Sequence, residues 1–183
     1  MGGAAQGSVE GLETMIHVCS LAKVEETVAR TGAERMLSLL TAGTEVVRPV
    51  SIARENHLHL VMHDIAAAQD GMTMPGEEHV RNLLDFAHRW DRARPMLVHC
   101  YAGISRSTAS AYIIAAALAP KRDEAELART LRTLSPSATP NPRLIAIADT
   151  LLGRDGRMIA AIEAIGRGAD AFEGTPFELK IDM

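Results

Sequence analysis

Short apolar runs alternate with amphipathic stretches along most of the chain. The lengths and compositions of four of these runs predict strands at 15–20, 36–41, 57–63 and 95–100. The run at 95–100 is continuously apolar, which is typical of a strand buried on both faces. The tail 167–183 either adds an edge strand at 177–181 or wraps around the rest of the chain.

The amphipathic stretches have the spacing of helices. We expect helices at 21–31, 77–91, 107–119, 123–134, 142–152 and 156–166. Val80, Leu83 and Ala87 recur at helical spacing in the second, and Asn141 with Pro142 forms the N-cap and first position of the fifth. This alternation of strands and helices predicts an α/β fold, a three-layer sandwich with a mostly parallel central sheet of four to five strands flanked by helices.

Length and charge narrow the class of protein. The chain has 183 residues, so we expect a leader at 1–14, unstructured or left over from an expression vector, and a single domain at 15–183. A net charge of −4 argues against nucleic acid or an anionic membrane as the main partner. The two cysteines are too few for a disulfide framework, and no secretion signal is visible. We therefore expect a cytoplasmic protein.

The strand expected at 95–100 ends in the sequence 98-VHCYAGISRST-108. The loop that follows leads into a helix, whose free backbone N–H groups and dipole favour an anion. Gly103 lets the backbone approach such a ligand, and Arg106 offers it two parallel donors. The loop thus predicts a nest for a tetrahedral oxyanion such as phosphate, sulfate or vanadate. Its expected lining is Tyr101, Ala102, Gly103, Ile104, Ser105 and Arg106.

Cys100 lies at the base of this loop. The field that holds an anion also favours the thiolate, and a thiolate below a bound phosphate is placed for in-line attack on phosphorus. Ser107 can donate a hydrogen bond to the sulfur and make it a better leaving group, whereas His99 more naturally orients the loop than acts as a base. The alternative is a buried, inert thiol, which is common for free cysteine but does not explain Arg106.

The string HCYAGISRST resembles the His-Cys-x5-Arg-Ser/Thr signature of the cysteine-dependent protein tyrosine phosphatases. Its Ala-Gly and Ser-Arg-Ser are most similar to the dual-specificity branch, and the order of elements from 15 to 155 fits the compact bacterial type. The resemblance implies a phosphatase-like fold and a phosphocysteine intermediate, with neither metal nor other cofactor. It also implies a carboxylic acid on a neighbouring loop that protonates the leaving group and later activates water.

Asp64 is the first candidate for this acid, because it directly follows the strand at 57–63, where the family's mobile acid loop begins. Asp70 lies in the same loop and is the second candidate. Asn141 resembles the family's Pro-Asn position, which would shape the pocket or orient the hydrolytic water. A plain helix N-cap explains Asn141 equally well.

The other cysteine and the histidines have simpler explanations. Cys19 is expected to be an inert core thiol, with oxidative pairing to Cys100 as the alternative, because both lie at the same end of a parallel sheet. His57, His59 and His63 alternate along a strand and so share a face, but only Asp64 joins them at ligand spacing. We therefore expect a strand face rather than a metal site.

The leading functional hypothesis is a hydrolase of phosphotyrosine, with phosphoserine and phosphothreonine as further candidates, in a phosphorylated protein or a small phosphoester. The Cys100 loop contains no lysine, which disfavours a phosphoinositide head group. Three alternatives stay open. The first is a catalytically weak module that binds phosphorylated partners, the second a phosphatase of non-protein phosphoesters, and the third a sulfur enzyme of the rhodanese or arsenate-reductase type.

Overall fold

A computed structural model describes residues 14–182, and its strands form one five-stranded sheet in the order β3-β2-β4-β1-β5. Their bounds are β1 Met15–Ser20, β2 Arg35–Leu40, β3 His57–Val61, β4 Met96–Cys100 and β5 Phe177–Lys180. β1 to β4 are parallel, and β5 adds an antiparallel edge beside β1. The mostly parallel sheet is therefore confirmed. The leader expected at 1–14 lies outside the described residues, apart from Thr14.

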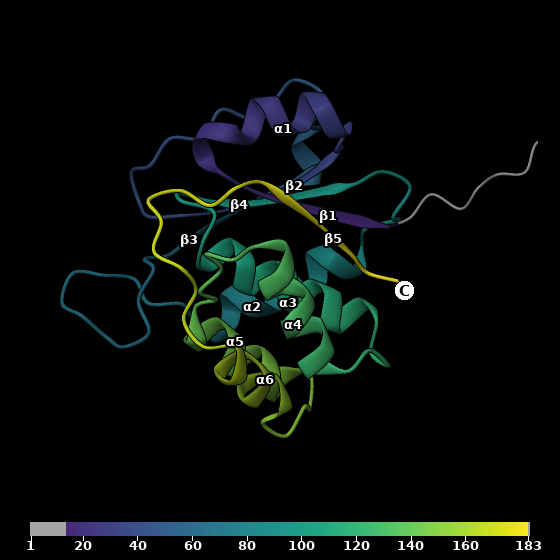
Figure 1. Cartoon of the computed structure of the whole chain (residues 1–183). Helices are drawn as coiled ribbons and strands as arrows, with labels where there is room; N and C mark the ends of the chain where they lie inside the picture. Colours follow the sequence, from purple (N-terminus) through teal and green to yellow (C-terminus); the bar gives the residue numbers. More distant parts are fainter. Residues whose placement is uncertain (1–13, 183) are drawn as a thin grey trace, which may run out of the picture.

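Helices cover both faces of this sheet and complete the three expected layers (Figure 1). α1, Val24–Thr31, lies on one face and the remaining helices on the other. Those helices are α2 Glu77–His88, α3 Arg106–Leu118, α4 Glu124–Leu134, α5 Pro142–Leu151 and α6 Arg157–Ile165. Two short 3₁₀ turns, Leu21–Lys23 and Arg54–Asn56, precede α1 and β3.

α3 is the centre of the helical layer. Its residues 106–116 are all buried, and it packs against the sheet as well as α2, α4 and α5. Its many alanines make it apolar all round while letting these neighbours approach closely, as expected for a central helix. Neither α3 nor any other helix within residues 14–182 is long and apolar enough to cross a membrane.

The strand expected at 57–63 ends at Val61. Two predicted helices are each three residues shorter than their sequence pattern suggests. The helix expected at 77–91 stops at His88, where Trp90 Nε1 donates to Arg94 O at 2.9 Å and fixes the turn toward β4. The helix expected at 21–31 begins as a 3₁₀ turn, in which Leu21 N donates to Tyr101 O at 3.1 Å. In both places a contact with the following turn or with a distant loop overrides the local helical pattern.

Candidate active site

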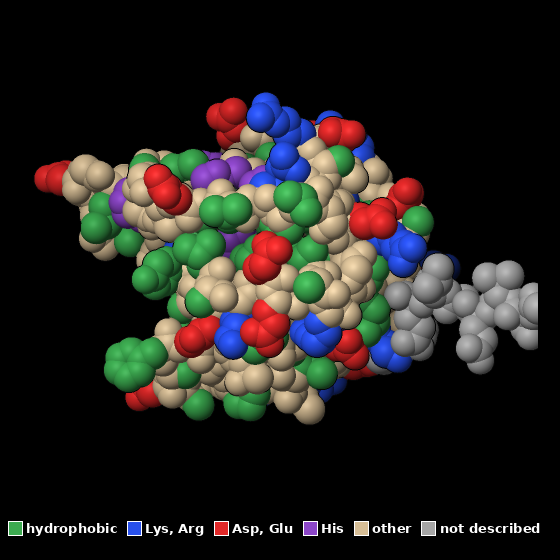
Figure 2. Space-filling view, turned by 90° about the horizontal axis from the view of Figure 1, so that it is seen from above, with side chains coloured by type: hydrophobic (Ala, Val, Ile, Leu, Met, Phe, Trp, Pro, Cys, Tyr) green, Lys and Arg blue, Asp and Glu red, His purple; other side chains and the backbone are tan. Residues whose placement is uncertain are grey.

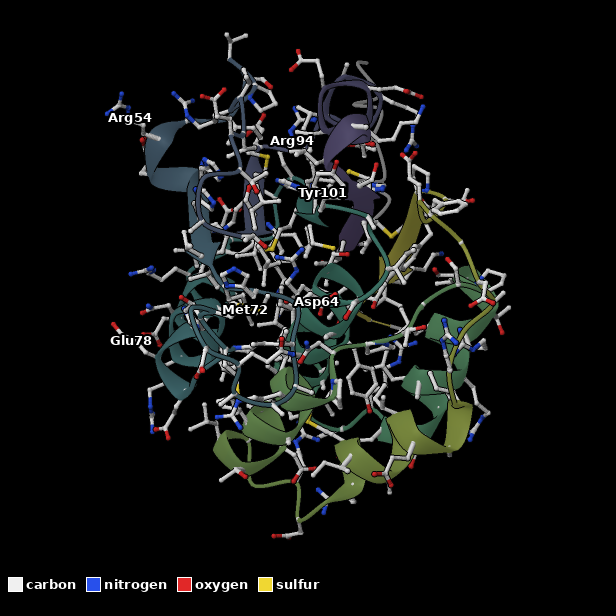
Figure 3. The ribbon with its side chains drawn as sticks, turned by 90° about the vertical axis from the view of Figure 1, so that its left-hand side faces the viewer. Arg54, Asp64, Met72, Glu78, Arg94 and Tyr101 are labelled. Carbon is white, nitrogen blue, oxygen red and sulfur yellow. The ribbon has the colours of Figure 1, made fainter. Side chains whose placement is uncertain are left out.

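The loop formed by residues 100–106, here called the Cys100 loop, joins the carboxyl end of the central strand β4 to the N-terminus of α3. β1, β2 and β3 end at the same edge of the sheet because they run parallel to β4. Their following segments therefore converge on the Cys100 loop, the usual place for a site in such sheets. Figure 3 looks onto this edge and shows Tyr101 and Asp64 near its centre.

Gly103 determines the shape of the Cys100 loop. Its φ of 72° lies in the left-handed region, and a Cβ there would come within 2.8 Å of Ser20 N at the end of β1. Only glycine fits this close approach. The Gly103 backbone N–H donates to Cys100 Sγ at 3.3 Å, so the loop curls over the sulfur.

Cys100 and Ser107 meet as predicted. The Cys100 side chain is buried, with 2 % of the residue exposed, and its Sγ lies 3.1 Å from Ser107 Oγ. Both the Ser107 hydroxyl and the Gly103 N–H can donate to a sulfur anion. The arrangement therefore provides hydrogen-bond donors for negative charge on Cys100.

Hydrogen bonds to two neighbouring segments hold one end of the Arg106 guanidinium. Nη1 donates to Met62 O at 2.9 Å and to Thr41 Oγ1 at 3.4 Å, and the residue is only 6 % exposed. Its Nε is buried without a hydrogen-bond partner among the described residues. An unpaired buried donor is costly, so an oxyanion at the Cys100 loop would satisfy it.

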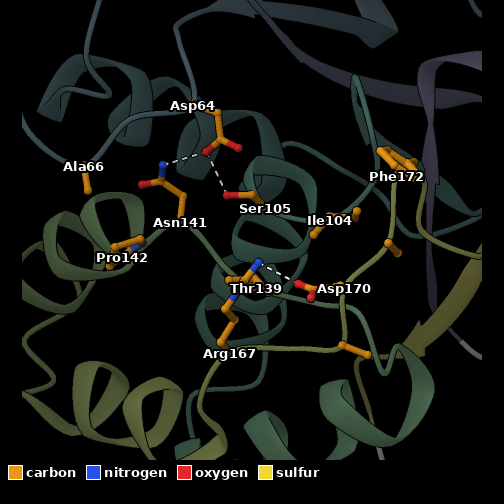
Figure 4. A pocket seen from close by; sticks show the side chains of 12 residues that line it. Asp64, Ala66, Ile104, Ser105, Thr139, Asn141, Pro142, Arg167, Asp170 and Phe172 are labelled. Carbon is orange, nitrogen blue, oxygen red and sulfur yellow. Dashed lines mark hydrogen bonds and ion pairs between the residues drawn. The ribbon is translucent and has the colours of Figure 1, made fainter. Parts of the chain in front are cut away.

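Asp64 is held against the Cys100 loop by two donors. Its Oδ1 accepts from Ser105 Oγ at 2.7 Å and from Asn141 Nδ2 at 2.9 Å, as Figure 4 shows. Asn141 is the predicted N-cap of α5, because its Oδ1 accepts from the backbone N–H groups of Arg143 and Leu144. Its role toward the hydrolytic water stays a prediction. The cap fixes the amide that orients Asp64.

Asp70 lies farther along the same connection between β3 and α2, which projects to the left in Figure 1. His63 and Thr73 close the base of this loop through His63 N–Thr73 O at 2.8 Å and Thr73 N–His63 Nδ1 at 2.9 Å. Asp70 is exposed, and within residues 14–182 no hydrogen bond links it to the Cys100 loop. Of the two candidate acids, Asp64 is the one that is hydrogen-bonded to the Cys100 loop within the described residues.

His99 supports the Cys100 loop from inside the sheet. It is fully buried, with Nε2 2.6 Å from Ser38 Oγ and Nδ1 3.3 Å from Cys100 O. Ser38 Oγ also lies 2.9 Å from His57 Nε2. Burial lowers the pKa of both His99 and His57 to about 4, so both rings are neutral near pH 7. A neutral, fully hydrogen-bonded His99 fits a positioning role.

The remaining histidines of the predicted shared face separate in the structure. His59 stacks on His57 with ring centroids 6.2 Å apart, whereas His63 turns to Thr73 in the following loop. In the part of the chain that the structure describes, no three histidine, cysteine or acidic side chains are grouped as a metal site would require.

Cys19 lies on the opposite face of the sheet from Cys100. It packs with Val24 and Leu97 beneath α1, and its thiol interacts with Thr27. Burial raises the pKa of the Cys19 thiol to about 12, which makes it unreactive. Although β1 and β4 end together, the opposite orientation of these side chains argues against the pairing considered from the sequence.

A groove of about 630 Å³ adjoins the Cys100 loop and was not predicted from the sequence. One wall contains Asp64, Ile104 and Ser105; the opposite wall belongs to residues 167–174, here called the C-terminal strap (Figure 4). The sequence suggested only that this tail wraps or adds an edge strand, and it does both. Its glycines, Gly168 and Gly174, were the available hint of close backbone packing.

Solved structures with a similar fold include several phosphatases. The chain aligns with the Cydia pomonella PTP-2 phosphatase at 15% identity and a TM-score of 0.59, over 76% of this chain and 86% of that one. It aligns with human DUSP28 at 18% and 0.57, over 82% and 95%. For PTPMT1 in complex with PI(5)P the values are 11% and 0.59, over 84% and 96%.

No family model and no curated protein matches the sequence. At these identities the structural likeness concerns the fold. The chain has the fold of the protein tyrosine and dual-specificity phosphatases, as the resemblance of its Cys100 loop predicts.

Proposed function

We propose that the protein is a phosphomonoester hydrolase that acts on phosphotyrosine through a phosphocysteine intermediate on Cys100, with no metal ion in either step. The proposal is carried by one observation: the buried Arg106 Nε has no partner and belongs to the same loop as the Cys100 sulfur. A phosphate bound to the loop amides and Arg106 would lie above this sulfur. The phosphatase fold of the chain supports the same reaction.

In the first step, the Cys100 thiolate attacks phosphorus and the bond from phosphorus to the ester oxygen breaks. The departing oxygen needs a proton, for which Asp64 is the proposed donor. Both hydrogen bonds to Asp64 end on Oδ1, so Oδ2 is the oxygen left to carry that proton. Ser105 and Asn141 thus orient the acid without occupying its reactive oxygen.

In the second step, water attacks phosphorus, gives its proton to Asp64 and breaks the bond between phosphorus and sulfur. Inorganic phosphate leaves and the thiolate returns. The hydroxyl of Ser107, 3.1 Å from Cys100 Sγ, would stabilise the departing sulfur by hydrogen bonding. Asp64 is exposed, which gives water access to it.

Cys100→Ser tests this function. We expect it to abolish hydrolysis of p-nitrophenyl phosphate in buffer containing EDTA, because the serine hydroxyl is far less acidic than a thiol. The variant should still bind vanadate, since the loop amides and Arg106 are unchanged. Rapid acid quenching of the wild-type enzyme during turnover should trap phosphate on Cys100. Undiminished turnover by Cys100→Ser would refute the proposal, and vanadate binding without turnover by the wild-type chain would favour a binding module.

A further inference from the structure

The C-terminal strap is anchored to the Cys100 loop at its far end. Gly174 N donates to Ala102 O at 2.8 Å, and a Cβ on Gly174 would come within 2.5 Å of Gly103 O. The adjacent Glu173 accepts from Ser20 Oγ at 2.5 Å, where β1 ends beside Cys100. The backbone of the strap is therefore fixed against the loop that is proposed to bind phosphate.

The near end of the strap is anchored as well. Gly168 N donates to Thr139 Oγ1 at 3.1 Å and Ala169 N donates to Pro136 O at 2.9 Å. Between these anchors Phe172 is fully exposed to solvent. A backbone anchored at both ends thus presents a large aromatic side chain at the rim of the groove, across from Asp64 (Figure 4).

Exposed hydrophobic side chains are concentrated around the site. Large ones occur on the segment after β2, on the loop after β3, on the Cys100 loop and on the strap; they are Val47, Val50, Met72, Tyr101 and Phe172. Figure 2 shows hydrophobic side chains at the left-hand edge, from which these loops project in Figure 1. Apolar surface gathered around a site is typical of one that binds a protein segment.

Asp64 is both the proposed acid and a lining residue of the groove. The acid must face the leaving oxygen, so the leaving group extends from phosphorus toward Asp64. Asp64 accepts a hydrogen bond from Ser105 of the Cys100 loop, and both residues line the groove. The group attached to the leaving oxygen therefore enters the groove.

The charged residues that line the groove restrict the chemical class of the group attached to the leaving oxygen. Its charged lining residues are Asp64, Arg167 and Asp170, and Arg167 Nη2 already donates to Asp170 Oδ1 at 2.7 Å. No unpaired cation remains among them for a second phosphate. A polyphosphorylated head group would meet two carboxylates there, whereas an aromatic ring and a neutral or basic peptide segment would meet complementary surface.

We propose that this groove holds the peptide segment adjoining a phosphotyrosine, with Phe172 as its apolar anchor. The inference rests on the proposed function and adds to it a contact surface, the C-terminal strap, for the residues beside the phosphotyrosine. Phe172 is then a specificity-determining residue that contacts substrate outside the phosphate site.

Comparison of two substrates tests the proposal. Kinetics of Phe172→Ala would be measured with a phosphotyrosyl peptide containing apolar residues beside the phosphotyrosine, and with p-nitrophenyl phosphate, which is too short to reach the strap. We expect kcat/KM for the peptide to fall about tenfold, mostly through KM, as when an aromatic anchor is removed from an interface. The value for p-nitrophenyl phosphate should stay within about twofold of wild type, because the loop and acid are untouched.

Leu134→Ala is the matched control, since Leu134 is an exposed large hydrophobic residue at the end of α4 that does not line the groove. It should leave both substrates unaffected. A second variant, Asp170→Asn, releases Arg167 from its ion pair and should raise kcat/KM for a peptide with glutamates beside the phosphotyrosine.

Equal effects of Phe172→Ala on both substrates, or no effect on either, would overturn the inference. So would faster wild-type hydrolysis of free phosphotyrosine or a phosphoinositide than of the peptide. These outcomes differ from failure of the proposed function, which would appear as undiminished turnover by Cys100→Ser.

Discussion

Asp64, the proposed acid, is held in place by two neighbours that have no role in the proposed proton transfer. Ser105 belongs to the Cys100 loop and Asn141 caps α5, yet both hydrogen bonds end on the same carboxylate oxygen. The Asp64 carboxylate is thereby oriented by two segments that are far apart in the sequence. Its assignment leads to a prediction that separates it from Asp70.

Asp64→Asn should slow hydrolysis of alkyl or unsubstituted phenyl phosphates by about a hundredfold or more, because a poor leaving group depends on a proton from the acid. p-Nitrophenyl phosphate should be affected much less, since its leaving group departs readily as an anion. The measurement is kcat against leaving-group pKa for both Asp64→Asn and Asp70→Asn. If Asp70→Asn gives the steeper dependence and Asp64→Asn does not, the acid has been assigned to the wrong residue.

Contacts within the site could be predicted where the residues that make them are close together in the sequence. Cys100 and Ser107 are separated only by the short loop and the first residue of α3, so their spacing was enough to predict the contact between sulfur and hydroxyl. The anchor of Arg106 could not be predicted, because Met62 contributes a backbone carbonyl, which carries no side-chain information. The contact with Thr41 was weakly indicated by the sequence, because Thr41 is a polar residue that follows a buried strand.

At the scale of elements, the Cys100 loop depends on the end of β1 behind it. Gly103 lies against Ser20 N and Cys19, so the loop and strand fit only without a Cβ between them. The loop is therefore shaped by a neighbouring strand as much as by the helix that follows it.

Gly103→Ala should reduce kcat with p-nitrophenyl phosphate by about a hundredfold or more, since small displacements of reacting groups are costly. Gly153→Ala is the control: it also has a positive φ, but no atom within 4 Å of a new Cβ, so it bears only the conformational cost of about 1 kcal/mol. Thermal unfolding of both variants separates the two effects. Similar activity in the two variants would mean that the close approach to β1 is unimportant.

The helices and strands could largely be predicted from periodicity, but the tertiary contacts between distant segments could not. The alternation of apolar runs with helical stretches predicted the parallel sheet, because a strand buried on both faces and a fully apolar α3 leave few other arrangements. The contact of Gly174 with Gly103 depends on where a tail folds back after six helices, and no local pattern encodes that. The groove was missed for the same reason.

At the scale of the whole molecule, buried histidines link stability to pH. His99 and His57 have pKa values lowered to about 4 by burial, and Ser38 joins them inside the sheet. In the unfolded chain both would titrate near their ordinary value of about 6.5. Between the folded pKa of about 4 and the unfolded pKa of about 6.5, the unfolded chain therefore binds more protons than the folded one. The contribution of these two histidines to stability is present above about pH 6.5 and is lost as the pH falls toward 4.

We expect the free energy of unfolding to decrease by about 2 kcal/mol between pH 7 and pH 5 on account of His99 alone. Urea unfolding of the wild-type chain and of His99→Asn at the two pH values would measure this contribution. Asparagine keeps a hydrogen-bonding group but does not titrate, so the variant should lose less stability on acidification. An equal loss in both proteins would show that His99 does not carry the effect.

The C-terminal strap follows α6 in the chain, so it is synthesised after the segments that it contacts. A ribosome completes the Cys100 loop and all six helices before it makes Glu173 and Gly174, which brace that loop from behind. A nascent chain that has emerged only as far as α6 holds the proposed nucleophile in an unbraced loop. The proposed activity would therefore depend on translation passing Gly174, beyond the last of the helices that surround the site.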